Sequence, residues 1–373
     1  MKTRFASLAV LATSVAVSFA VTAAAGPGEP GAAKPMFTTI PYNAPGHTAP
    51  IGQPPANLAQ WSGGFTDLTG HAIHFVMVGT DPSSNNAPTT ITTVIIPVIM
   101  TYGATNGNMT FNPKSDLYPN GQKVIKNMLK SPVFTSAVDF TSGGQDMGST
   151  QYVDAFQRGN FWGANVQTNT NYHVLLSSAP TVLKPLKITV TSTQGKVIVN
   201  PFGTIKVGTM NINSFDSALQ GYLRAHTADI HPDVLPIFVS DNIYLTSGGC
   251  CIGGYHSANG GPPGGQTYSY TTLVTESGSF SEDVSALTHE ISEWLDDPFT
   301  NNHVNCNDNS ILEVGDPLVS GLPNYGNFVY HSNNFDYHLQ DEVYIGYFGA
   351  PTSTSVNNQL DFQGAWHSVC PGQ

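Results

Sequence analysis

Apolar residues recur at helical spacing in the segment SEDVSALTHEISEWLDD (Ser281–Asp297). The recurring positions are Val284, Leu287, Ile291, Trp294 and Leu295. This period predicts one amphipathic helix. Residues four apart lie one turn above each other, so His289 and Glu293 project to the same side, and Glu290 lies beside them. Ser279 and Glu282 predict a capping box at the start of the helix.

Elsewhere, short β-branched runs alternate with turns and with a few helical patterns. The predicted strands are Thr90–Tyr102, four short runs between Tyr172 and Met210, Leu235–Leu245 and Thr267–Thr275. The predicted helices are Lys123–Leu129, Gln151–Phe161 and Asn213–His226, the last capped by Asn213 or Ser214. The Gly-rich stretch SGGCCIGGYHSANGGPPGG predicts a turn. Together these elements predict an α+β fold, with a mixed or antiparallel sheet and few helices.

The N-terminal region has the pattern of an export signal. A short basic start precedes an apolar run that ends in Ala23–Ala25, which favours a cleaved signal peptide over residues 1–25 rather than a membrane anchor. Residues 26–60 are rich in Pro and Gly and predict a leader or linker. Residues 61–373 then form one large domain, with a β-rich lobe (61–225) and a lobe that carries the metal-type helix (226–373).

Charged residues are few and mainly acidic, with 25 Asp and Glu against 13 Lys and Arg. Loss of Lys2 and Arg4 with the signal leaves 11 basic residues and a net charge of −14. This balance excludes nucleic-acid binding through a basic surface. It also argues against membrane binding after signal cleavage, because no basic amphipathic stretch is present. We expect a secreted or periplasmic protein.

The four cysteines, Cys250, Cys251, Cys306 and Cys370, all lie in the last third of the chain. In an exported protein an even number of cysteines predicts disulfides. Of the three pairings, the one that joins the neighbours Cys250 and Cys251 is strained and the least expected. A zinc site built on cysteine is the rival interpretation, but no CxxC pair supports it.

The helix Ser281–Asp297 carries the strongest chemical signal. His289, Glu290 and Glu293 form an HExxE variant of the HExxH zinc-hydrolase helix, in which residues i and i+4 bind the metal and the intervening Glu activates water. Zinc accepts carboxylate oxygen as well as imidazole nitrogen, and added oxygen donors also admit manganese or calcium. The best candidates for a further ligand are Glu313 and Asp316 in LEVGDP.

Other residues are weaker candidates for this site. Asp297 and His303 are near in sequence, and His256, His331 and His338 are more distant choices. The candidates for a transition-state stabiliser are His303, His338, Tyr337 and Tyr344. The bland interpretation is an exposed acidic helix face. Against it, six acidic residues lie on this helix with no Lys or Arg to balance them, so a cation is a natural partner.

The stretch VSALTHEISEWLDDPFTNN resembles the HExxE-containing helix of the exordium (phosphate-induced) family, extracellular proteins of plants. Glu313 and Asp316 are similar to the Glu-x-x-Asp segment of that family, and Cys251–His256 is similar to its Cys- and His-containing turn. The resemblance implies an extracytoplasmic, zincin-like protein linked to the cell wall. It implies no defined reaction, and it makes this chain a distant, bacterial-type relative.

The leading hypothesis is a secreted, zincin-like hydrolase, most plainly a divergent metallopeptidase. His289, Glu293 and Glu313 or Asp316 would bind a divalent metal, zinc before calcium or manganese, and Glu290 would be the general base. The substrate would be a protein, a peptide or the cell wall. The alternative is a non-catalytic extracellular protein that binds the cell wall or a partner and has a structural metal site.

Overall fold

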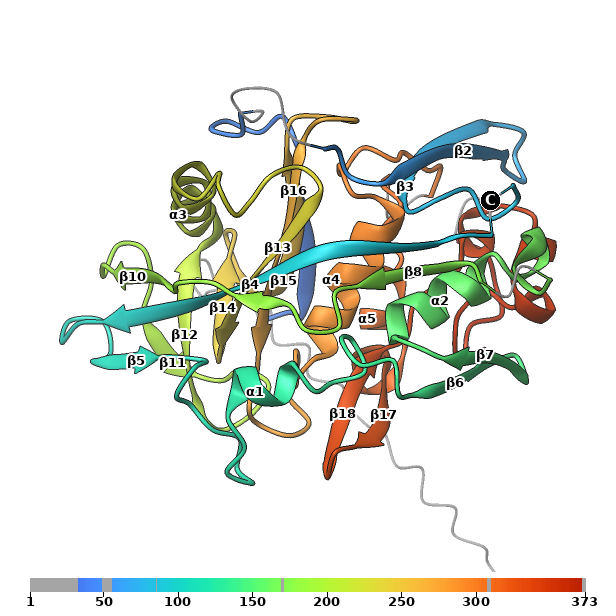
Figure 1. Ribbon diagram of the computed structural model, residues 1–373. Coiled ribbons are helices and arrows are strands. Elements are labelled where there is room, and N and C mark those ends of the chain that lie inside the picture. The colour runs from blue at the N-terminus through green and yellow to red at the C-terminus, as the bar shows by residue number, and fades with distance from the viewer. Residues whose placement is uncertain (1–32, 49–55, 85, 169–170, 307–309, 371–373) are drawn as a thin grey trace, which may run out of the picture. The chain divides into compact units, whose positions relative to one another are not determined.

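A large mixed β-sheet organises the chain, and Figure 1 shows its strands running through the centre of the molecule. The computed structural model describes residues 33–48, 56–84, 86–168, 171–306 and 310–370. Within these residues the main sheet has twelve strands, with the path β10-β4-β13-β16-β15-β14-β12-β11. Strand β1 pairs with β15, whereas β5, β8 and β9 pair with β4. Parallel and antiparallel pairs occur in the same sheet, which confirms the predicted α+β class.

The elements have the following bounds. The strands are β1 (Met36–Ile40), β2 (Gln60–Thr66), β3 (Ala72–Val78), β4 (Pro88–Tyr102), β5 (Met109–Phe111), β6 (Asp139–Ser142), β7 (Gln145–Ser149), β8 (His173–Leu176), β9 (Thr181–Val182), β10 (Leu186–Val190), β11 (Val197–Val199), β12 (Lys206–Asn211), β13 (Val234–Asp241), β14 (Ile243–Thr246), β15 (Cys250–Asn259), β16 (Gln266–Leu273), β17 (Asn327–Ser332) and β18 (Phe335–Gln340). The helices are α1 (Val124–Met128), α2 (Tyr152–Asn160), α3 (Ile212–Ala225), α4 (Ser285–Asp296) and α5 (Asp316–Gly321), with short helical turns η1 (Trp162–Val166), η2 (Pro323–Gly326), η3 (Ile345–Phe348), η4 (Thr352–Thr354) and η5 (Val356–Asn358).

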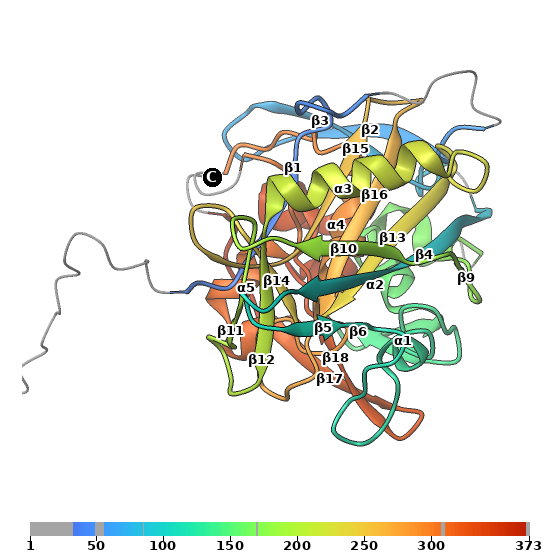
Figure 2. The same cartoon turned by 90° about the vertical axis from the view of Figure 1, so that its left-hand side faces the viewer.

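Helices α3 and α4 cover opposite faces of the main sheet. The apolar side chains of α4 join one hydrophobic core, and those of α3 join another. Strand β13 alternates between the two, with Ile237 in the core under α4 and Phe238 in the core under α3. Successive strand residues point to opposite faces, so this alternation places the two helices on either side. Figure 2 shows α3 crossing in front of the strands and α4 behind them.

Most of the predicted elements are present, and the differences have local causes. The run Thr90–Tyr102 lies in β4, and the helices α1, α2 and α3 confirm three predicted helices. The cap of α3 is Asn211, whose side chain accepts a hydrogen bond from the backbone N–H of Ser214, rather than Asn213 or Ser214. The predicted strand Leu235–Leu245 is two strands, β13 and β14, because Asn242 turns the chain with φ of +51°.

The Gly-rich stretch around the paired cysteines was predicted as a turn, and this prediction is wrong for Cys250–Asn259. These ten residues form β15, between β16 and β14 in the sheet, and the strand is buried almost throughout. The glycines serve close packing here. A Cβ on Gly254 would lie 2.6 Å from Glu290 Oε1 of α4, so only glycine lets this helix carboxylate sit against the strand.

Helix α4 is buried on all sides, in contrast to the predicted amphipathic helix. Each of its twelve residues is buried, including His289, Glu290 and Glu293. The helix packs against β15 and β16 and also contacts β18, β3 and α2. The predicted capping box is absent, because Glu282 Oε2 accepts from the N–H of Gly278 instead.

Part of the predicted leader belongs to the fold. Strand β1 lies within residues 26–60 and pairs in parallel with β15, from Met36 beside Ile252 to Ile40 beside Ser257. The β-branched run between Pro35 and Pro41 is compatible with a strand, and Phe37 is buried. Contacts group Ala33–Gln373 into one compact unit. The predicted signal peptide, residues 1–25, lies outside the described residues.

The cysteines form the bridges Cys306–Cys370 and Cys250–Cys251. The prediction of disulfides is therefore confirmed, but the expectation that the neighbouring pair would be avoided is wrong. The first bridge ties the segment after α4 to the C-terminal segment. Within the described residues, no helix is both long and apolar enough to cross a membrane.

Candidate metal centre

Helix α4 places His289 and Glu293 on one side, as their spacing predicts. His289 Nε2 lies 3.0 Å from Glu293 Oε1, and both side chains are buried. Asp316, the first residue of α5, brings its Oδ1 to 3.7 Å from the same His289 nitrogen. One donor atom from each of the three residues lies within 4.8 Å of the others, which is the spacing of ligands around one ion.

Gly315 lets the segment before α5 approach α4. A Cβ at this position would lie 2.2 Å from His289 Nδ1 and 2.8 Å from Glu342 Oε2. The Gly315 N–H donates to Glu293 Oε1 over 3.2 Å and so fixes one oxygen of this carboxylate. Glu342 is buried and neither of its oxygens has a hydrogen-bond partner among the described residues, so it lies at the same glycine as a further carboxyl of the site.

Strand β15 brings a second histidine, His256, to Glu293. Its Nδ1 lies 3.5 Å from Glu290 Oε2 and 3.8 Å from Glu293 Oε2. These three residues form a second group with donor atoms within 4.8 Å of each other, and Glu293 belongs to both groups. From the sequence His256 is only a distant candidate, because the glycines beside it are typical of a turn rather than of the strand that carries it.

The tautomer of His256 follows from its hydrogen bond. Its Nε2 lies 3.0 Å from the backbone carbonyl of Asp297, and a carbonyl oxygen only accepts, so Nε2 carries a proton. Burial lowers the pKa of His256 to about 4, so the ring is neutral near pH 7 and Nδ1 presents a lone pair. That lone pair faces the carboxyl groups of Glu290 and Glu293. Histidines that bind metals typically have this arrangement, in which one ring nitrogen donates to a carbonyl and the other is left to bind the ion.

Several polar atoms of the site are buried without a hydrogen-bond partner. Among the described residues these atoms are His256 Nδ1, His289 Nδ1 and both oxygens of Glu290. Most buried polar atoms in proteins are hydrogen-bonded, because a lost bond to water is costly. Several unsatisfied polar atoms around Glu293 are a good fit for a bound cation.

The site electrostatics divide the carboxyl groups into two kinds. Burial raises the pKa of Glu290 well above its usual range, and the charges of Glu293 and Asp316 raise it further. The pKa of Glu313 is raised in the same way, by burial and then by the charge of Glu293. For Glu293, burial also acts upward, but His289 and then His256 outweigh it and lower the pKa. In the metal-free chain, Glu293 is therefore the carboxyl of this cluster that ionises most readily, and Glu290 holds its proton more tightly than usual.

Glu313 is near the site but belongs to neither group. Its Oε1 lies 3.9 Å from Nε2 of His256, the nitrogen whose proton already goes to the Asp297 carbonyl. Asp297 itself accepts from the backbone N–H groups of Asn301 and Asn302, as a residue that closes the turn after a helix does. Of the sequence candidates, His289, Glu293 and Asp316 are brought together most closely.

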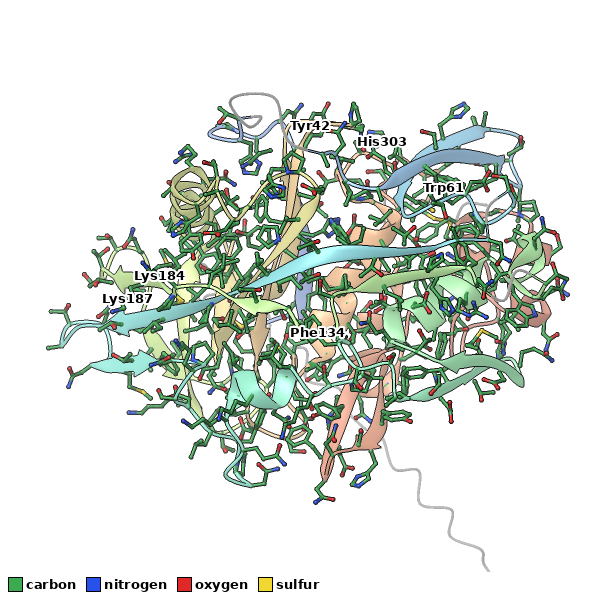
Figure 3. The ribbon with its side chains drawn as sticks, in the orientation of Figure 1. Tyr42, Trp61, Phe134, Lys184, Lys187 and His303 are labelled. Carbon is green, nitrogen blue, oxygen red and sulfur yellow. A yellow bond between two sulfur atoms is a disulfide. The ribbon has the colours of Figure 1, made fainter. Side chains whose placement is uncertain are left out.

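The remaining candidates lie elsewhere. His303 is exposed on the surface (Figure 3) and contacts the Ser310 carbonyl. The hydroxyl of Tyr337 donates to Asn127, and that of Tyr344 pairs with Ser142. His331 pairs with Asp336 at the surface, and His338 belongs to a separate cluster with Asp283. None of these side chains stands in the two groups around Glu293.

Access to the site is through Asp316. Its side chain is 38% exposed, whereas those of His289 and Glu293 are 0% and 1% exposed. Asp316 lines a cavity of about 470 Å³ together with Phe37, Tyr347, Trp366 and the Cys306–Cys370 bridge. Phe37 of β1 stacks on the His289 ring at 3.6 Å between centroids and so covers this side chain.

In comparisons of the chain with protein-family models, with curated proteins and with solved structures, nothing matches.

Proposed function

We propose that this chain is a secreted metal-dependent hydrolase, most plainly a divergent peptidase with an HExxE centre. The observation that carries the proposal is the set of buried donor atoms around Glu293 that lack hydrogen bonds. His289, Glu293 and Asp316 would hold the ion, and His256 is placed to complete the set. The resemblance of the helix to the exordium family supports an extracytoplasmic setting.

The donor chemistry favours zinc. Two imidazoles with carboxylates suit zinc or manganese, whereas calcium takes oxygen ligands and rarely imidazole. When bound, such an ion supplies Lewis acidity at the end of the cavity. A bound cation would favour the anionic form of Glu290, whose two oxygens make no hydrogen bond among the described residues. The carboxylate could then accept a proton from a water molecule and return it to a leaving group.

A structural metal site is the second candidate function. The stacking of Phe37 on His289 and the near-complete burial of the donors favour it, because a closed site is typical of structural zinc. A non-catalytic wall-binding or partner-binding protein would then be the outcome.

Metal analysis of the purified mature protein separates these candidates. We expect one equivalent of metal at this centre, lost in His289→Ala and retained in Glu290→Gln. Hydrolysis of a peptide library by the wild type, lost in both variants, would support the peptidase. The exposed Asp229→Asn is the matched control for removal of one acidic charge. Metal held by the wild type without cleavage of any peptide favours the structural site, and metal-free wild type together with metal-free His289→Ala contradicts both.

A further inference from the structure

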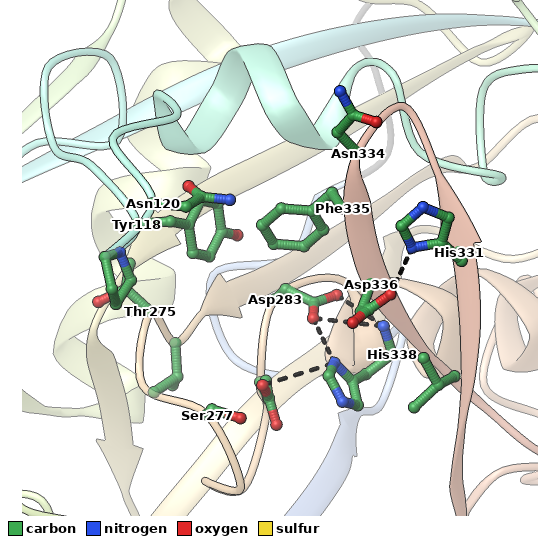
Figure 4. Close-up of a pocket in the computed structure, with 14 residues that line it drawn as sticks. Tyr118, Asn120, Thr275, Ser277, Asp283, His331, Asn334, Phe335, Asp336 and His338 are labelled. Atoms are coloured by element: carbon green, nitrogen blue, oxygen red, sulfur yellow. Dashed lines mark hydrogen bonds and ion pairs between the residues drawn. The ribbon is translucent and has the colours of Figure 1, made fainter.

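A second cavity lies at the other end of the α4 region, away from the residues of the metal centre. It has a volume of about 380 Å³ and is lined by the loop before α4, by the β17–β18 hairpin and by the turn at Tyr118–Asn120 (Figure 4). Three residues with ligand chemistry meet here: Glu282, Asp283 and His338. None of the described residues that line the cavity is lysine or arginine.

The donor atoms converge on one point. His338 Nδ1 lies 2.6 Å from Asp283 Oδ2 and 3.5 Å from Glu282 Oε1, and the three ligand atoms lie within 4.8 Å of each other. The backbone N–H of His338 donates to Asp283 Oδ1 over 3.0 Å, and the N–H of Gly278 holds the other oxygen of Glu282. The remaining oxygens are therefore oriented toward the imidazole before any ion arrives.

A buried tyrosine that lines the cavity, Tyr118, is an independent sign of a ligand. Tyr118 is only 5% exposed, and its hydroxyl makes no hydrogen bond among the described residues. Figure 4 shows Tyr118 across the cavity from Asp283 and beside Phe335, whose ring packs against it at 5.0 Å. A buried hydroxyl without a partner is costly, and a water molecule held by a cation in the cavity would satisfy it.

We propose that Glu282, Asp283 and His338 bind one divalent cation of the zinc or manganese type, with the Tyr118 hydroxyl hydrogen-bonded to a water molecule of that ion. One imidazole and two carboxylates are a donor set that such ions accept. In the absence of metal, Nδ1 of His338 carries the proton that it donates to Asp283. Binding of the ion at Nδ1 would displace this proton, which either leaves to the solvent or moves to Nε2 of the ring.

The ion would fasten the β17–β18 hairpin to the start of α4. His338 belongs to β18, whereas Glu282 and Asp283 precede the helix. A further link already exists one turn along, where the Thr288 hydroxyl oxygen accepts from the Gln340 N–H over 2.9 Å. A cation at this position therefore stabilises the α4 region from its N-terminal end, independently of whether the His289 centre is catalytic.

Zinc titration of the full mature chain after EDTA treatment tests this site. Isothermal calorimetry and metal analysis should give two ions per chain, falling to one in Glu282→Gln and in His338→Gln. His331→Gln is the matched control, since it lines the same cavity but pairs with Asp336 outside the donor set. His289→Gln should remove the other ion and leave this one.

The outcomes separate the two sites. A single ion that is lost in His338→Gln and kept in His289→Gln supports this site while the proposed catalytic centre fails. A single ion lost only in His289→Gln overturns it, as does an unchanged stoichiometry and affinity in Glu282→Gln and His338→Gln. If those variants do not fold, Tyr118→Phe decides the question: a fall of about tenfold in affinity with the melting temperature in EDTA maintained supports the site, and an unchanged affinity contradicts it.

Discussion

Glu290 is a buried carboxyl whose two oxygens make no hydrogen bond among the described residues. A substitution at this residue can show whether metal binding and catalytic turnover are separable. Glutamine keeps its shape and removes its acid–base function, so Glu290→Gln should retain the metal and lose about 10²- to 10⁴-fold in turnover if Glu290 is the general base. Metal analysis beside a peptide-cleavage assay checks this. A variant that loses metal and activity together would instead make Glu290 a ligand.

Gly315 tests whether the approach of α5 to α4 matters. In Gly315→Ala, the added Cβ would meet His289 Nδ1, so we expect a loss of about 1–3 kcal/mol in unfolding free energy and weaker metal binding. Gly221→Ala in α3 is the control, because a Cβ there meets nothing within 4 Å and alanine favours a helix interior. Urea unfolding of both variants measures the difference. Equal effects would show that helix propensity, not crowding at His289, determines the result.

At the scale of elements, strand β1 covers the candidate metal centre through Phe37, which stacks on His289. Phe37→Ala removes the ring that stacks on His289, and truncation of a buried Phe usually costs about 3–5 kcal/mol. We therefore expect a lower denaturation midpoint and faster loss of metal to a chelator. The rate of metal loss to the chelator is measured without denaturant, at a temperature well below the melting temperature. Under these conditions it distinguishes uncovering of the site from general unfolding. Unchanged metal release would mean that Phe37 packs beside the site without covering it.

The elements also show what the sequence could and could not predict. The helical period of α4 and the i, i+4 pair His289 and Glu293 were predictable, because both depend on local geometry alone. The position of Asp316 was predicted from its nearness in sequence. Strand β15 was not predicted, because the glycines that permit α4 to pack against it are also typical of a turn. His256 was therefore ranked only as a distant candidate. Strand β1 was not predicted, because the prolines on either side of it made the segment look like part of an extended leader.

At the scale of the whole molecule, acidic groups dominate the charge, and many of them are buried. Asp296 and Asp297 end α4 inside the core. Burial raises the pKa of Asp296 to about 7. The hydrogen bond from Gln157 acts to lower this pKa, whereas the neighbouring charge of Asp297 acts to raise it. Asp297 is raised to about 7 by burial, opposed by hydrogen bonds from Asn301 and Asn302. Such a concentration of carboxyl groups makes the stability of the metal-free chain depend on pH.

The direction of this dependence follows from proton linkage. The folded chain binds a proton at Asp296 more tightly than the unfolded chain, whose pKa is near 3.8. The stabilisation from that proton is complete below about pH 4 and is lost as pH rises through about 7. In EDTA, the melting temperature of the wild type should therefore fall between pH 5 and pH 8. Asp296→Asn carries no proton to lose and should flatten this fall, whereas the exposed Asp229→Asn should leave it unchanged. Equal slopes in the wild type and in Asp296→Asn would contradict a neutral Asp296.

Added zinc should raise the wild-type melting temperature most at pH 8, because the anionic donors are then deprotonated and protons no longer compete with the ion.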